Sequence, residues 1–366
     1  MTRLLIVDDS ALMRRVLGDV FQNEPGFEVA FARDGVEALA QVHAFRPDVI
    51  TLDVQMPRMD GLSCLDRIMV ERPCPVVMVS SLTAEGADAT LEALELGAVD
   101  FVAKPDGAVS LAIDDFGPIL VEKVVTAAAS RLRRSHRLAE RLRARHGAIA
   151  TSPPAPPQPR GKPAAAWKPR PAGMPPGLVI IGTSTGGPPA LDVVLSEMPA
   201  DFPWPILVAQ HMPAAFTASL AHRLDGLCAL RVIEVARPTP LIPGCVYVAR
   251  GDADMTVSRR SAGPVALSAP SSAEHRWHPS VDRLVDSAAL AVPPERLVGV
   301  LMTGMGNDGA RSMAALRAAG GRTIAESEDT AVVWGMPGEL VKAGGADVVA
   351  PLDSIAGKIR EMVWAG

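Results

Sequence analysis

A serine, a histidine and an aspartate each follow a short apolar run in the second half of the chain. Ser184 lies in Gly-Thr-Ser-Thr-Gly-Gly, His211 in Gln-His-Met-Pro, and Asp308 in Thr-Gly-Met-Gly-Asn-Asp-Gly. A hydroxyl nucleophile needs a base within hydrogen-bond reach, and the base needs an acid that fixes its tautomer and stabilises the imidazolium. These residue types supply the three roles, so we predict that Ser184, His211 and Asp308 form a catalytic triad.

The residues around Ser184 predict a strand, a tight turn and a helix. The β-branched run 178–181 stops at a glycine, and an amphipathic stretch at 188–198 follows the Ser/Thr cluster. Glycine allows a sharp bend, and a helix N-terminus favours developing negative charge. The stretch also fits the Gly-x-Ser-x-Gly pattern of serine hydrolases. Taken alone, it is as typical of an anion-binding loop as of a catalytic turn.

Further strands are expected near 206–209, 246–248, 298–302 and 348–349. Strands that alternate with helices form a doubly wound parallel sheet, and ligands bind at the carboxyl ends of its strands. All three triad residues can therefore reach one sheet edge. Their order along the chain differs from the Ser, Asp/Glu, His order of α/β-hydrolases, which argues against an ordinary lipase or esterase. Of the other histidines, we expect only His275 and His278, in a loop, to be able to contact substrate.

The first half of the chain shows the same alternation. Strands are expected at 4–7, 49–52, 76–79 and 101–102, and helical patterns occur at 10–22 and 61–71. Five polar residues follow these strands: Asp8, Asp9, Asp53, Ser80 and Lys104. Three carboxylates at one edge repel one another unless a divalent cation with oxygen ligands neutralises them. A nearby hydroxyl and ammonium group would hold an oxyanion, so the site suggests a phosphoryl group on Asp53.

Composition sets the outer limits of these interpretations. The chain has 366 residues, a formal net charge of −5 and 48% apolar residues, which indicates a globular protein with room for two cores and gives no reason to expect nucleic acid as a partner. We expect no signal peptide and no membrane insertion. The four cysteines show no metal-binding spacing, which favours reduced thiols in a bacterial-type cytoplasm.

The middle of the chain differs in composition from both halves. Seven arginines occur between residues 131 and 145, interleaved with leucines, which is typical of a basic, solvated helical extension; an RNA-binding or membrane-surface role is the less favoured alternative. Ten prolines follow between residues 151 and 176, which predicts an extended, semi-rigid linker. We therefore expect three parts, at 1–121, 122–175 and 176–366.

The first part resembles a response-regulator receiver domain over its whole length. Its motifs are Asp8-Asp9, the stretch from Asp53 to Gly61, Val-Ser80-Ser, and Phe101-Val-Ala-Lys104-Pro. The resemblance implies a flavodoxin-like fold with Asp53 as phosphoacceptor. It also implies that Mg²⁺ is bound by Asp9, Asp53 and the Gln55 carbonyl, and by Asp8 through water. Ser80 and Phe101 fall on the switch positions, and Lys104 on the residue that contacts the phosphoryl oxygens.

The third part resembles the catalytic domain of the chemotaxis protein-glutamate methylesterase/protein-glutamine glutaminase family, the CheB family. The three triad stretches carry the resemblance, together with His-Pro-Ser-Val-Asp282 and Gly335-Met-Pro337. It implies a Rossmann-like α/β fold, with Ser184 as nucleophile, His211 as base and Asp308 as orienting acid. His278 departs from the family, which commonly has arginine there, so a substrate or surface contact is expected to differ.

The resemblance implies hydrolysis of glutamyl methyl esters on methyl-accepting chemoreceptors, and glutamine deamidation by the same chemistry. The phosphodonor would be the chemotaxis histidine kinase, and the receiver would inhibit the esterase until Asp53 is phosphorylated. We expect the backbone N–H groups of Thr185 and Met305 to stabilise the oxyanion, because each lies in a Gly-rich turn beside a triad residue. Two other classes remain open, namely a response regulator with a non-catalytic binding module and a hydrolase of small esters.

Overall fold

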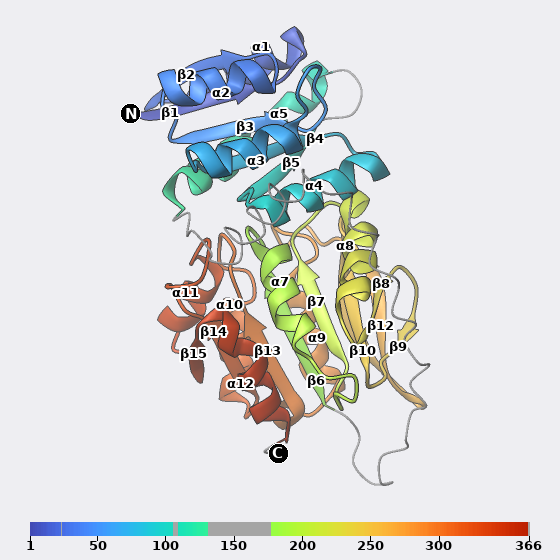
Figure 1. Cartoon of the computed structure of the whole chain (residues 1–366). Helices are drawn as coiled ribbons and strands as arrows, with labels where there is room; N and C mark the ends of the chain where they lie inside the picture. The colour runs from blue at the N-terminus through green and yellow to red at the C-terminus, as the bar shows by residue number, and fades with distance from the viewer. Residues whose placement is uncertain (23, 105–108, 131–176, 365–366) are drawn as a thin grey trace, which may run out of the picture. The chain divides into compact units, whose positions relative to one another are not determined.

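The computed structural model describes residues 1–22, 24–104, 109–130 and 177–364. The chain divides into two compact units, Met1–Pro156 and Pro157–Gly366, each with its own sheet (Figure 1). The expected basic extension from residue 131 and the proline-rich linker lie outside the described residues. The boundary expected at residue 121 falls inside a helix, since α5 (Val109–Ala129) continues beyond it.

The first unit is a five-stranded sheet in which every pair of neighbouring strands is parallel. The order is β2-β1-β3-β4-β5, and the strands are β1 (Thr2–Val7), β2 (Phe27–Ala32), β3 (Val49–Asp53), β4 (Val76–Ser80) and β5 (Asp100–Ala103). This order confirms the expected flavodoxin-like, doubly wound fold. Strand β2 was not predicted, because this edge strand is only partly buried and lacks a continuous apolar run.

Helices cover both faces of this sheet. The remaining helices of the unit are α1 (Ala11–Gln22), α2 (Gly35–Ala44), α3 (Gly61–Glu71) and α4 (Ala84–Leu96). Helix α1 packs beside α5, whereas α2, α3 and α4 pack in a row on the other face (Figure 1). Three of them begin at side-chain caps, with Asp34, Asp60 and Thr83 accepting backbone N–H bonds. The sheet therefore presents its strand ends at one edge, where the predicted acidic residues lie.

The second unit is a seven-stranded parallel sheet in the order β15-β14-β13-β6-β7-β10-β8. The strands are β6 (Leu178–Thr183), β7 (Ile206–Gln210), β8 (Arg231–Val235), β10 (Cys245–Ala249), β13 (Leu297–Leu301), β14 (Arg322–Glu326) and β15 (Val348–Ala350). Strands β6, β7, β10 and β13 are fully buried, as expected for a sheet covered on both faces. Strands β8 and β14 were not predicted, because the first is exposed in part and the second begins and ends in charged residues.

Two groups of helices cover this sheet. Helix α7 (Gly187–Ser196) packs between α8 (Ala214–Leu227) and α12 (Leu352–Trp364). Helix α10 (Ala310–Ala318) packs between α9 (Val281–Ala291) and α11 (Met336–Lys342). None of the helices in the described residues has the length and apolar composition that a membrane span requires.

A small antiparallel sheet adds to the expected doubly wound fold. It consists of β9 (Thr239–Pro240), β11 (Ala253–Arg260) and β12 (Gly263–Pro270), in the order β11-β12-β9. Helix α9 packs against β11. This sheet was not predicted from the sequence. It matters for the site because the buried residue Asp254 lies on β11.

The strand order places the three predicted triad segments together. The chain proceeds from β6 to β7, β8 and β10 on one side, and then returns to β13 on the other side of β6. Ligands of doubly wound sheets bind at such a switch point, outside the carboxyl ends of the strands. Ser184 follows β6, His211 follows β7, and Asp308 lies in the loop after β13. All three lie at the switch-point edge.

Candidate active site

Ser184 lies in a tight turn directly after β6. Its backbone N–H donates to the Thr303 carbonyl at 3.0 Å, and its own carbonyl accepts the Gly187 N–H at 2.8 Å. Gly186 has a φ of 75°, in the left-handed region that favours glycine. On the opposite loop, a Cβ at Gly304 would lie 2.7 Å from the Ser184 Cβ, so only glycine allows the loop to approach this closely. The turn is therefore held from two sides.

The start of α7 differs from the prediction. The helix begins at Gly187 and ends at Ser196, instead of spanning 188–198. Its first N–H already donates to the Ser184 carbonyl, and the next two residues are prolines, which have no N–H. The first turn of α7 therefore supplies few of the backbone donors that were expected there. Donors for a developing oxyanion have to come from the turn itself or from the loop that faces it.

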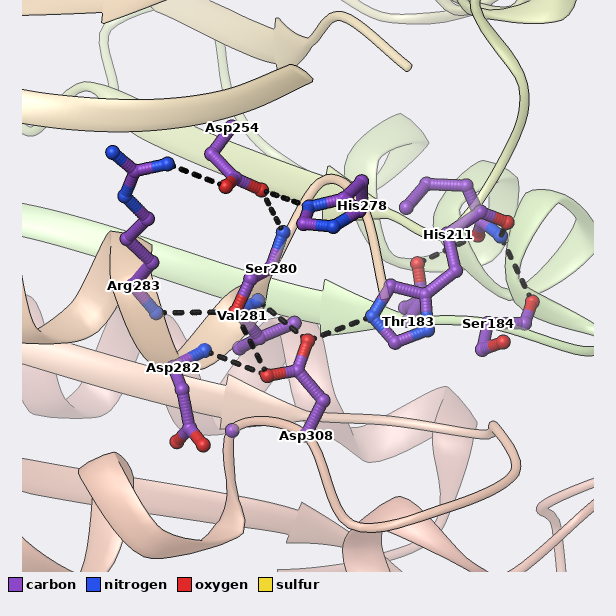
Figure 2. A network of polar contacts seen from close by, with 12 residues as sticks. Thr183, Ser184, His211, Asp254, His278, Ser280, Val281, Asp282, Arg283 and Asp308 are labelled. Atoms are coloured by element: carbon purple, nitrogen blue, oxygen red, sulfur yellow. Dashed lines mark hydrogen bonds and ion pairs between the residues drawn. The ribbon is translucent and has the colours of Figure 1, made fainter. Parts of the chain in front are cut away.

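His211 and Asp308 form a buried pair. The distance from His211 Nε2 to Asp308 Oδ2 is 2.8 Å, and the two side chains are only 7% and 4% exposed (Figure 2). The carboxylate also accepts N–H bonds from Val281 at 2.7 Å and Asp282 at 3.0 Å, and the Ser280 hydroxyl at 3.1 Å. These donors lie at the start of α9, where the helix dipole also favours a negative charge.

This set of donors keeps Asp308 ionised. Burial by itself raises the pKa of a carboxyl group, but the bonds from His211 and from the two backbone N–H groups outweigh it, and the pKa of Asp308 lies below its ordinary value. An ionised Asp308 can only accept a hydrogen bond, so the Nε2–H group of His211 is the donor. The hydrogen bond therefore assigns the imidazole to the tautomer with its proton on Nε2.

The other ring nitrogen of His211 is left as an acceptor. Nδ1 is buried and has no hydrogen-bond partner among the described residues. In Figure 2, Asp308 lies on one side of the imidazole, and Ser184 lies on the side of the other nitrogen. Because the His211 N–H donates to the Thr183 carbonyl at 3.0 Å, the ends of β6 and β7 are in register here. A basic nitrogen without a partner, beside a serine turn, can take a proton from a hydroxyl group.

Gln210 holds the serine turn and the histidine together. Its Nε2 donates to the carbonyls of both Ser184 and His211, at 3.0 Å each, and its Oε1 accepts the Thr183 hydroxyl at 2.7 Å. The side chain is buried and all its hydrogen-bonding groups are used. Gln210 belongs to the Gln-His-Met-Pro stretch, but no role was predicted for it. The only available signal was a polar residue at the end of an apolar strand.

A loop before α9 closes one side of the site. The Trp277 ring is stacked on His211 at a centroid distance of 5.9 Å and an interplanar angle of 2°. His278 Nδ1 lies 3.0 Å from Asp254 Oδ1, and the same buried carboxylate accepts the Ser280 N–H at 2.7 Å. Arg283 donates to the other oxygen of Asp254 at 2.7 Å. His278 thus belongs to a network that fixes the donors of Asp308. His275 donates its backbone N–H to the Ser272 carbonyl.

The two residues expected to supply the oxyanion donors lie next to the nucleophile. Thr185 follows Ser184 in the turn, and its carbonyl accepts the Thr303 hydroxyl at 2.8 Å. Met305 follows Gly304, the residue that approaches the Ser184 side chain. Both peptide groups belong to the two segments that meet at Ser184, so their assignment stays a prediction that the arrangement supports.

A second polar site lies at the strand ends of the first unit. Asp8, Asp9 and Asp53 each offer a carboxylate oxygen, and these atoms lie within 4.8 Å of one another. Oxygen ligands of this kind fit Mg²⁺. Lys104 Nζ lies 2.7 Å from Asp53 Oδ2 and 3.0 Å from Asp8 Oδ2. Burial raises the pKa of Asp53, with a further rise from Asp8, while Lys104 opposes both effects. A cation at this site would favour the ionised, nucleophilic carboxylate.

The predicted switch residues of this unit are buried. The Ser80 hydroxyl donates to the Gly86 carbonyl at 3.1 Å, and Phe101 is only 4% exposed. The Lys104 N–H donates to the Ser80 carbonyl at 2.7 Å, which joins the two strand ends. The Gln55 N–H lies 3.5 Å from Asp53 Oδ1, so Gln55 is next to the acidic cluster. In this arrangement the Ser80 hydroxyl bonds to the backbone of α4.

Glu326, at the end of β14, is a buried carboxyl group that sequence analysis did not identify. It has no exposed surface, and its Oε2 accepts the Thr303 N–H at 2.8 Å. Burial raises the pKa of Glu326 to about 7. Nothing in the sequence marked this residue, because its contact is with Thr303, which follows the neighbouring strand β13.

We predict that Glu326→Gln removes a pH-dependent loss of stability. A carboxyl group with a raised folded-state pKa keeps its proton between about pH 4.5 and 7 while the unfolded chain loses it, so the free energy of unfolding falls as pH rises through this window. A shift of this size corresponds to about 3 kcal/mol. In denaturant unfolding, the free energy of unfolding of Glu326→Gln minus that of wild type should therefore increase by about 3 kcal/mol between pH 4.5 and pH 8.

The matched control is Glu339→Gln, which removes a half-buried carboxylate of the same unit that pairs with Lys342. It should follow the wild-type pH dependence. A difference between Glu326→Gln and wild type that is the same at pH 4.5 and pH 8 would show that the Glu326 carboxyl group does not titrate in this window.

Comparisons with known proteins match each of the two parts of the chain to a family. The family described as "CheB methylesterase" matches residues 179–359, and "Response regulator receiver domain" matches residues 4–112. The crystal structure of the Thermotoga maritima CheB methylesterase catalytic domain is similar, with a TM-score of 0.50 and 38% identity, and covers 52% of this chain and 100% of that one.

Two full-length relatives bear the same name, protein-glutamate methylesterase/protein-glutamine glutaminase. The protein numbered 2 of Rhodopseudomonas palustris (strain BisB18) is 57% identical over 99% of this chain and 98% of its own length. The protein numbered 3 of Rhodospirillum rubrum is 52% identical over 98% of this chain and 96% of its own length. The similarity thus spans both the receiver and the esterase parts. The chain belongs to the protein-glutamate methylesterase/protein-glutamine glutaminase (CheB) family.

Proposed function

We propose that this chain is a phosphorylation-activated serine hydrolase that removes methyl groups from glutamyl methyl esters, and deamidates glutamines, on methyl-accepting chemoreceptors. The observation that carries the proposal is the buried His211–Asp308 pair, whose free Nδ1 lies on the side of Ser184. The family relationship adds the substrate class. The four free cysteines, all buried, are consistent with a cytoplasmic protein.

In the proposed mechanism, Ser184 is the nucleophile. Nδ1 of His211 takes the hydroxyl proton as Oγ attacks the γ-carbonyl of the glutamyl ester, and the imidazolium then gives that proton to the departing methanol. A water molecule, activated by the same nitrogen, hydrolyses the acyl-enzyme. Ammonia is the leaving group when the substrate is glutamine. Asp308 stabilises the imidazolium and fixes the ring in both half-reactions.

The oxyanion of each tetrahedral intermediate is assigned to the N–H groups of Thr185 and Met305. The first turn of α7 has two prolines, and its Gly187 N–H already donates to the Ser184 carbonyl. Donors from the serine turn and the facing loop are therefore the better candidates. One such donor contributes about 10²- to 10³-fold in rate, and a positioned general base about 10²- to 10⁴-fold. Both effects depend on the approach of the 303–309 loop to Ser184.

The first unit is proposed to receive a phosphoryl group on Asp53 from the chemotaxis histidine kinase. Asp8, Asp9, Asp53 and the Gln55 carbonyl would hold Mg²⁺, which neutralises the acidic cluster. Lys104 would contact the phosphoryl oxygens. The Ser80 hydroxyl, which now bonds to Gly86, would turn to the phosphoryl group, and Phe101 would rearrange with it. We propose that this change relieves inhibition of the esterase.

The two alternative classes make different predictions. A binding module would associate with a receptor after phosphorylation without releasing methanol. A hydrolase of small esters would act on free esters and not on a methylated receptor. The assembled His211–Asp308 pair argues against the first, and the full-length similarity to protein-glutamate methylesterases argues against the second.

Substitution of the nucleophile tests the proposed reaction. Ser184→Ala should lower methanol release from a methylated receptor preparation by at least about 10³-fold, because the covalent step is lost. Release is followed by gas chromatography of the headspace, with Ser196→Ala, on the exposed end of α7, as the control. Near-wild-type release by Ser184→Ala would remove the assignment.

Phosphorylation dependence is tested through Asp53. A small phosphodonor with Mg²⁺ should raise methanol release by wild type several-fold and leave Asp53→Asn unchanged, since the amide cannot accept a phosphoryl group. The unstimulated rates of the two proteins should be similar. Stimulation of Asp53→Asn by the phosphodonor would place the acceptor elsewhere.

The direction of regulation is tested with a fragment that begins near Gly173. If the receiver is inhibitory, this fragment should release methanol faster than the unphosphorylated full-length chain under the same conditions. Circular dichroism would establish that the fragment is folded. Equal rates for the fragment and the full-length chain would exclude an inhibitory role of the receiver.

A further inference from the structure

Glu326 has a place in the second unit that the proposed mechanism does not use. It is the last residue of β14, the strand beside β13, and its side chain is completely buried. Oε2 accepts the Thr303 N–H at 2.8 Å, whereas Oε1 makes no hydrogen bond of normal geometry among the described residues, although the nearby Thr330 side chain lowers the pKa of the group. A buried carboxyl group without full pairing is costly. Glu326 is connected to the serine turn through a single residue, Thr303.

Thr303 connects this carboxyl group to the nucleophile. Its carbonyl accepts the Ser184 N–H at 3.0 Å, and its hydroxyl donates to the Thr185 carbonyl at 2.8 Å. The same hydroxyl accepts the Val333 N–H at 3.1 Å. Thr303 therefore holds both residues of the turn, and the bond from its own N–H to Glu326 fixes Thr303 in the sheet edge.

We propose that Glu326 is a positioning residue of the ester-hydrolysing site, which fixes the Ser184–Thr185 turn through Thr303. This inference rests on the proposed function. A Thr303 N–H without an acceptor would be buried and unpaired, and the residue would move to find a partner. Small displacements of a nucleophile cause large losses in rate. The role requires an acceptor at Oε2 and not a negative charge, so a glutamine carbonyl can perform it.

A pair of substitutions separates the acceptor from the charge. Glu326→Gln keeps an oxygen acceptor, whereas Glu326→Met has a similar length and offers only a weak acceptor. In methanol release from a methylated receptor by the full-length chain, Glu326→Gln should keep kcat within about threefold of wild type. Glu326→Met should lower kcat by more than about tenfold, with KM within about threefold, because the turn is displaced and the substrate surface is not.

The control for loss of a carboxylate is Glu339→Gln, at a half-buried position of α11. Wild-type kcat in Glu326→Met would overturn the proposal, as would equal losses of kcat in Glu326→Gln and Glu326→Met. A change confined to KM would overturn it as well, because it would assign Glu326 to substrate binding.

A second pair tests the connection if Glu326→Met does not fold. Thr303→Ser keeps the hydroxyl that bonds to Thr185, and Thr303→Val replaces it with a methyl group of similar size. Thr303→Val should lower kcat by about tenfold or more, and Thr303→Ser should stay close to wild type. Equal kcat values for the two variants would contradict the proposed connection. If Ser184→Ala kept its activity in the same assay, the proposed function itself would fail, and the two failures are thereby distinguished.

Discussion

The buried hydrogen bond between Asp308 and His211 is the interaction on which the second unit's chemistry depends. It fixes the proton of the imidazole on Nε2 and leaves Nδ1 as the basic nitrogen. This hydrogen bond requires an ionised Asp308. Backbone N–H donors at the start of α9 stabilise the ionised carboxylate. Asp254 in turn fixes these donors through Ser280. Loss of Asp254, on the small antiparallel sheet, would therefore disturb the donors of Asp308 and make His211 a weaker base, although Asp254 does not contact His211 directly.

The doubly wound sheet explains why such a site can form from distant parts of the chain. Parallel strands bring their carboxyl ends to one edge, and the return of the chain from β10 to β13 places β6 between β7 and β13. Ser184, after β6, therefore lies beside the loop after β13 that carries Asp308. His211 follows β7, the neighbouring strand on the other side of β6. The same logic forms the acidic site of the first unit, in a smaller sheet with a different strand order. One architecture serves two reactions because the residues at the strand ends differ.

Sequence reasoning was most successful where the chemistry lies directly at a strand end. Ser184, His211 and Asp308 each follow a buried apolar run, so their convergence could be predicted. Their roles remain proposals. What could not be predicted depends on contacts between segments far apart in the chain, such as the hydrogen bonds that Asp308 accepts from residues at the start of α9. Glu326 and Gln210 belong to the same class, because a polar residue at a strand end does not reveal which partner it meets.

Local structure set other limits to prediction. Strand β2 at a sheet edge, and β8 and β14 with their polar residues, lack the continuous apolar run that marked the central strands. The turn after β6 was predicted, but the expected donors of α7 were not found, because two prolines follow its first residue. The proposed oxyanion donors, Thr185 in the turn and Met305 in the loop after β13, do not depend on the N–H groups of this helix.

The tautomer of His211 tests the central claim most directly. Long-range proton–nitrogen NMR correlations of ¹⁵N-labelled protein distinguish the two neutral imidazole forms, and a His211→Gln variant assigns the signals. The account predicts that the neutral form of the ring carries its proton on Nε2, and that this preference is lost in Asp308→Asn. A ring protonated on Nδ1, or a tautomer that does not respond to Asp308→Asn, would contradict it.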